Sequence, residues 1–78
     1  MPTILRVHGY RFFFFTREGS EPPHIHIENA GNYAKYWIRP VRLARNRGFL
    51  SRHLRMIRSL VEEYETLFEE KWNERFGY

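Results

Sequence analysis

Apolar and polar residues in the first half of the chain alternate with the two-residue period of β-strands. Residues 3–8 alternate, residues 10–15 are rich in strand-forming aromatic side chains, and residues 24–28 place isoleucines between polar residues. Residues 33–39 form a further strand-like segment that Pro40 ends. Glycine and proline separate the segments. The pattern predicts an antiparallel sheet of about four strands.

The segments at 24–28 and 33–39 are predicted to form a hairpin around a four-residue loop at 29–32. The cross-strand pairs are then His24 with Trp37, His26 with Lys35, and Glu28 with Tyr33. Because opposed residues point to the same side of a sheet, these polar residues should share one exposed face. A slip of one residue would break the grouping.

The second half of the chain changes to a helical period. Residues 41–49 are compatible with either a strand or a short helix closed by Gly48. From Ser51 onward the apolar residues recur at three- and four-residue steps and form one stripe, which runs through Leu54, Ile57, Leu60, Val61, Tyr64, Leu67, Phe68 and Trp72. The prediction is an α+β domain over residues 1–78, with one long C-terminal helix packed on one face of the sheet.

Composition limits the class of protein. The chain has 78 residues and no cysteine, so neither disulfides nor a thiolate metal site are available. Its longest clearly apolar run, residues 12–15, is too short to span a bilayer, and its start lacks the pattern of a secretory signal. We expect a cytoplasmic protein without a membrane association. No phosphate-binding glycine loop or nucleophile elbow is present, and we expect no cofactor.

Charge is segregated along the chain. Residues 29–61 carry eight cations and no acidic residue, residues 1–28 are neutral, and residues 62–78 have a net charge of −4. Eleven of the thirteen cations are arginine, whose planar fork binds phosphate in two-pronged fashion. We therefore expect RNA or another polyanion as a partner. The candidate nucleic-acid-binding residues are Trp37, Arg39, Arg42, Arg45, Arg47, Arg52, Arg55 and Arg58.

The histidine strand allows three interpretations. His24, His26 and Lys35 could cleave RNA by acid–base catalysis, because histidine titrates near neutrality and the nearby cations would stabilise developing charge. His24, His26 and Glu28 resemble a metal-ligand set, but they span about 13 Å of strand and lie among cations, so we assign no metal. In the third interpretation the histidines are structural, stacked on Trp37 or hydrogen-bonded to the preceding loop.

Five segments of the chain resemble a known family. The segments are Gly9-Tyr10-Arg11-Phe12-Phe13-Phe14, Glu21-Pro22-Pro23-His24-Ile25-His26, Ala34-Lys35-Tyr36-Trp37, Asn46-Arg47-Gly48 and Glu70-Lys71-Trp72-Asn73-Glu74. Together they look like a small bacterial family catalogued as domain of unknown function family 4160. Its members are often encoded beside a second small protein, in pairs that look like toxin–antitoxin modules. The resemblance implies such a role and a small antitoxin-like partner, and it brings no established catalytic residue.

Two functional hypotheses follow. The first is a toxin-like, RNA-directed protein that cleaves RNA without a metal through His24 and His26, as an endoribonuclease. The second is a non-catalytic basic module that binds nucleic acid or an acidic partner protein, with structural histidines. Burial of His24 and His26 against Trp37 would favour the second hypothesis.

Overall fold

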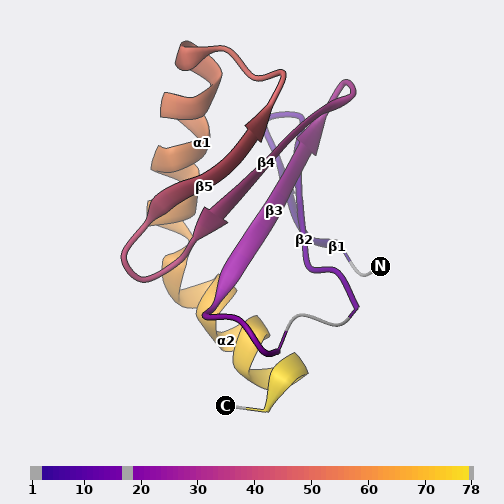
Figure 1. Cartoon of the computed structure of the whole chain (residues 1–78), viewed down its shortest axis with the longest axis vertical. Helices are drawn as coiled ribbons and strands as arrows, with labels where there is room; N and C mark the ends of the chain where they lie inside the picture. The colour runs from indigo at the N-terminus through magenta and orange to yellow at the C-terminus, as the bar shows by residue number, and fades with distance from the viewer. Residues whose placement is uncertain (1–2, 17–18, 78) are drawn as a thin grey trace.

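Five strands and two helices form the structure (Figure 1). A computed structural model of the chain describes residues 3–16 and 19–77. The strands are β1 (Thr3–Val7), β2 (Tyr10–Phe13), β3 (His24–Asn29), β4 (Asn32–Trp37) and β5 (Arg42–Arg47), and the helices are α1 (Ser51–Glu63) and α2 (Glu65–Phe76). The predicted α+β class is confirmed. The first two residues, and residues 17–18 of the loop expected between β2 and β3, lie outside the described residues.

The sheet is an antiparallel meander in the order β1-β2-β3-β4-β5. The predicted hairpin register is confirmed, because His24, His26 and Glu28 pair with Trp37, Lys35 and Tyr33. The turn is shorter than predicted: Asn29 pairs with Asn32, which leaves Ala30 and Gly31 at φ 50° and 84°. Positive φ at both central positions is the geometry that a two-residue hairpin turn prefers. One extra pair at the end of the hairpin shortens the loop without moving the register.

The ambiguous segment at residues 41–49 contains a fifth strand. Asn46, near the end of β5, donates a hydrogen bond from its amide to the carbonyl of Phe49 and accepts one from the Phe49 backbone N–H. Gly48 has φ 100°, and a Cβ there would collide with the side chain of Asn32. Glycine is therefore required where the chain leaves the sheet and enters α1.

The prediction of one long C-terminal helix is wrong, because Tyr64 separates α1 from α2. Its φ of −103° and ψ of 18° lie outside the helical region, although its N–H still donates to the carbonyl of Leu60. A straight helix over residues 51–76 would be about 39 Å long at 1.5 Å per residue, whereas the longest dimension of the molecule is 34 Å. The break lets both halves of the apolar stripe follow the sheet. Neither described helix is long and apolar enough to cross a membrane.

Both helices cover the same face of the sheet (Figure 1). The core between the two layers contains alternate strand residues such as Phe12, Ile25 and Ile27, packed against Phe68 and Trp72 of α2. The rings of Phe12 and Phe68 stack with centroids 5.3 Å apart. Side chains between these strand positions point to the other face, which no described helix covers. We call it the open face.

Candidate nucleic-acid interface

A row of side chains crosses the open face from one edge of the sheet to the other. The row consists of Arg6, Arg11, Glu28, Tyr33 and Arg47. In the strand register, each of these residues pairs with the next one in the row, on the neighbouring strand. Opposed residues in a sheet point to one side, so the row places three guanidinium groups, one carboxylate and one phenol along a line. We call it the cross-strand row. Every strand contributes one residue to it.

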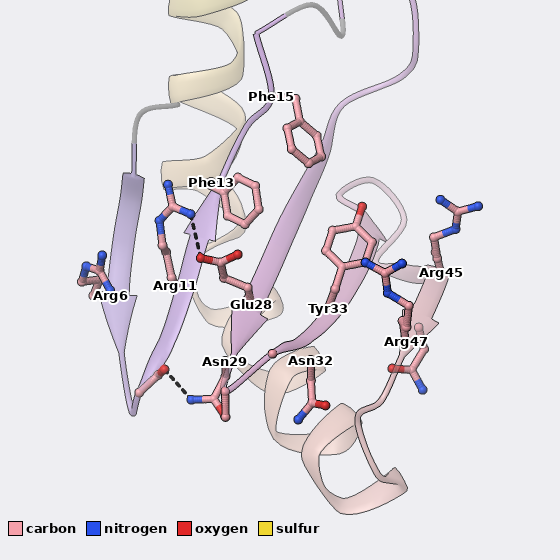
Figure 2. A pocket seen from close by; sticks show the side chains of 14 residues that line it. Arg6, Arg11, Phe13, Phe15, Glu28, Asn29, Asn32, Tyr33, Arg45 and Arg47 are labelled. Carbon is pink, nitrogen blue, oxygen red and sulfur yellow. Dashed lines mark hydrogen bonds and ion pairs between the residues drawn. The ribbon is translucent and has the colours of Figure 1, made fainter.

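The cross-strand row forms the floor of a pocket of about 850 Å³ (Figure 2). Arg45 joins Arg47 on one side of the pocket, and Phe13 and Phe15 lie toward the other end of β3. Arg47 lies over the ring of Tyr33, with its guanidinium carbon 5.9 Å from the ring centroid. The pocket thus combines cationic side chains with aromatic surface. This combination suits a strand of nucleic acid, which offers phosphates and flat bases.

Arg11 and Glu28 fix one side of the pocket. Nη1 of Arg11 donates to Oε1 of Glu28 over 2.8 Å, and Nε of Arg11 donates to the Thr3 hydroxyl over the same distance. The guanidinium carbon also lies 4.4 Å from the centroid of the Phe13 ring. Arg11 is held in one position by these contacts. Arg45 and Arg47, in contrast, pair with no carboxylate among residues 3–16 and 19–77, so their charge remains available to an anion.

His24 and His26 lie on the predicted face but are not exposed, which corrects the predicted exposure. His24 is 0% and His26 is 2% exposed. The ring of Phe15, itself 37% exposed, lies over His26 with centroids 4.3 Å apart. Trp37 and Trp72 enclose His24 at 5.6 Å and 4.8 Å. Aromatic rings and the segment before β3 therefore close over positions that strand alternation alone would leave in solvent.

Each histidine has a different polar neighbour. Nδ1 of His24 donates to the Pro22 carbonyl over 2.9 Å, because a carbonyl can only accept. Nδ1 of His26 lies 2.7 Å from the hydroxyl oxygen of Tyr33. This second contact connects a buried histidine with a residue that lines the pocket.

Lys35 belongs to a charged cluster beside the histidines. Its ammonium donates to Oε1 of Glu21 over 2.8 Å and lies 4.6 Å from the Trp37 ring centroid. The same carboxylate oxygen is 3.6 Å from Nδ1 of His24. The hydrogen bond from Lys35 is the main reason that the pKa of Glu21 falls below its usual 4.5, against a smaller opposing effect of burial. Lys35 and Trp37 are thus engaged with each other and with the loop.

The structure divides the predicted arginines among three places. Arg45 and Arg47 line the pocket, and Arg42 lies farther along exposed β5, opposite Trp37. Arg39 donates to Glu69 over 2.7 Å, and that carboxylate raises the pKa of the guanidinium. The remaining three, Arg52, Arg55 and Arg58, are exposed on α1, in the layer that covers the opposite face. Arg58 pairs with Glu62 at 3.4 Å.

Several pocket residues were not among the predicted site residues. Arg6 and Arg11 precede the acid-free run, and Phe13 and Phe15 belong to the aromatic segment that was predicted only as a strand. Tyr33 was predicted opposite Glu28, and that pairing was the available signal for its place on the open face. Among the described residues, no group of three or more His, Asp or Glu side chains could hold a metal ion.

The fold and this face define a small α+β domain with an open, arginine-rich sheet surface. Residues 9–73 match the family model described as domain of unknown function (DUF4160), and the chain belongs to this family. The match covers β2 to most of α2 and includes the pocket residues other than Arg6. No curated protein and no solved structure matches the chain.

Proposed function

We propose that this protein binds single-stranded RNA across the open face of its sheet. The proposal rests on the pocket, in which Arg45 and Arg47 of β5 lie on one side of the Tyr33 ring. A stacked base gains about 1–3 kcal/mol on an aromatic ring, and arginine pairs with the adjoining phosphates. His24 and His26 are buried, and His24 packs against Trp37, which favours the non-catalytic hypothesis over direct contact of these histidines with RNA. We therefore assign contact with RNA to Tyr33, Arg45 and Arg47.

A single strand suits the pocket better than a duplex. The aromatic surface can be reached only by bases that are unstacked, since duplex RNA presents phosphates and ribose on its outside. The proposed biological setting is a two-protein, toxin–antitoxin-like module, in which this chain acts on RNA and a small antitoxin-like protein is its partner. The resemblance of the sequence supports that setting.

The test compares a fluorescent single-stranded RNA with inorganic polyphosphate of equal charge, each titrated at several salt concentrations. We expect RNA to bind more tightly than polyphosphate, because only RNA offers bases to Tyr33. We also expect log K for RNA to fall with log salt by about 0.7 for each neutralised phosphate. Equal affinities would show that charge alone is recognised.

Polyglutamate serves as a third ligand in the same experiment. If it binds as tightly as RNA, the alternative function as a module for an acidic partner protein replaces the proposal. The exposed arginines of α1 are the surface that such a partner would use.

A further inference from the structure

A buried imidazole on the open face contacts a residue that lines the pocket. Nδ1 of His26 is 2.7 Å from the Tyr33 hydroxyl oxygen, and the two rings stack with centroids 5.7 Å apart. His26 is 2% exposed, whereas Tyr33 lines the pocket. A phenol in this position can exchange a proton with a ligand on one side and with an imidazole on the other.

We propose that Tyr33 and His26 cleave the RNA that the open face binds, with Tyr33 as the residue that touches the ribose. This inference rests on the proposed function and adds a reaction to it. His26 acts through Tyr33 and never contacts RNA. The assignment reconciles the burial of His26 with acid–base chemistry, because the proton reaches the imidazole through the phenol.

The proposed reaction is an internal transesterification, in which the ribose 2′-oxygen attacks the adjacent phosphodiester. The ribose 2′-hydroxyl passes its proton to the Tyr33 oxygen while Tyr33 passes its own proton to Nδ1 of His26. The 2′-oxygen forms a bond to the adjacent phosphorus, and the bond from phosphorus to the 5′-oxygen of the next nucleotide breaks. That oxygen takes a proton from water. The products are a 2′,3′-cyclic phosphate and a 5′-hydroxyl end, and nothing is oxidised or reduced.

The charges around the pair suit this step. Arg45 and Arg47 line the pocket on the side of Tyr33 and would stabilise the negative charge that develops on the phosphoryl oxygens. The proton gained by His26 creates a buried cation, which burial disfavours. The Glu21 carboxylate attracts that cation, and the Lys35 ammonium, which pairs with Glu21 over 2.8 Å and faces His26 across the hairpin, opposes it.

His24 is assigned no part in the transfer. Its Nδ1–H donates to the Pro22 carbonyl, and its ring contacts Trp37 and Trp72 rather than a pocket residue. It packs against His26 edge to face and so helps to hold that ring.

The experiment follows cleavage and binding of one end-labelled single-stranded RNA in EDTA. Tyr33→Phe retains the ring and removes the hydroxyl. His26→Asn places an amide oxygen near the position of Nδ1, where it can accept the Tyr33 hydrogen bond but cannot take up a proton. Tyr64→Phe, at the junction of the helices and away from the pocket, is the matched control.

We expect the wild type and Tyr64→Phe to release 2′,3′-cyclic phosphate ends. At RNA concentrations that saturate each protein, the other two variants should cleave at least about 100-fold more slowly than the wild type, the usual contribution of a general base. A purely structural contact would survive in His26→Asn, so loss of cleavage there identifies proton uptake. Circular dichroism checks that His26→Asn is folded. If His26→Asn is unfolded, the cleavage rate of Tyr33→Phe tests the inference instead.

Three results would overturn the inference. These are binding without cleavage by the wild type, full cleavage by Tyr33→Phe, and cleavage of an otherwise identical strand that lacks 2′-hydroxyls. The first leaves the proposed function standing. Failure of the wild type to bind RNA would remove the proposed function as well.

Discussion

Two arginine groups of similar charge lie in different surroundings. Arg45 and Arg47 line a pocket with aromatic rings on the open face, whereas Arg52 and Arg55 are exposed on α1, which covers the opposite face. In the chain all four belong to one acid-free run. The fold separates them, and only the first pair lies where phosphate pairing and base stacking can occur together. Charge along a sequence therefore predicts affinity for polyanions but does not locate the site.

The largest expected effect comes from reversing charge in the pocket. Arg45→Glu combined with Arg47→Glu should weaken binding of single-stranded RNA by at least about tenfold, because each arginine contact contributes about 1 kcal/mol or more. The matched control, Arg52→Glu with Arg55→Glu, makes the same change in net charge and should weaken binding by less than about threefold. Fluorescence anisotropy at fixed salt measures both. Equal losses would show that net charge alone determines binding.

The next effect distinguishes Tyr33 from Trp37, two aromatic residues of the open face. Tyr33→Ala should cost about 1–3 kcal/mol of RNA binding through the lost stacking surface. Trp37→Ala should change affinity much less, because Trp37 does not line the pocket. The same titration with both variants measures the difference, with circular dichroism as the check on folding. A larger loss for Trp37→Ala would move the binding surface toward the start of β3.

The smallest expected effect is on thermal stability and concerns the ion pair between Glu21 and Lys35. Because the folded state lowers the pKa of Glu21 below 4.5, the pair with Lys35 stabilises the protein above that pH, and this contribution is lost as the pH falls through the folded pKa. Glu21→Gln should therefore lower Tm at pH 7 by at most about 4 °C, since the carboxylate is half-exposed. At acid pH below the folded pKa of Glu21, the two proteins should have the same Tm.

Glu74→Gln is the control for that measurement, because Glu74 pairs with Lys71 on the surface of α2. Thermal unfolding followed by circular dichroism compares the three proteins at each pH. If Glu21→Gln destabilises the protein equally at both pH values, the lost contact is not an ionic one.

The register of the hairpin was predictable because it depends on local alternation. Glu28 faces Tyr33 whether the turn has four residues or two, so an error in loop length did not matter. The burial of His24 and His26 was not predictable from this pattern. The residues that cover them, Phe15 and Trp72, lie nine or more positions away along the chain and are brought there by the fold.

The helical stripe was also read correctly, but its break was not. Periodicity continues through Tyr64, and hydrogen bonds from Tyr64 to Leu60 and from Phe68 to Tyr64 continue with it. The break is local to the non-helical φ and ψ of Tyr64, for which the periodic pattern carries no signal. The pocket itself required Arg6 and Arg11 from the first two strands. The pairing of β2 with β3 depends on a long connection whose register no local signal specifies.

The meander has a consequence for how the chain folds. Each strand pairs with the strand before or after it, so most contacts within the sheet join residues that are near one another in sequence. Proteins with such local contacts search less conformational space and fold faster than those that pair distant strands. The helices follow the strands in the chain, so during synthesis the sheet emerges from the ribosome before the layer that covers its apolar face. That face is the surface that a nascent chain would have to protect until Phe68 and Trp72 arrive.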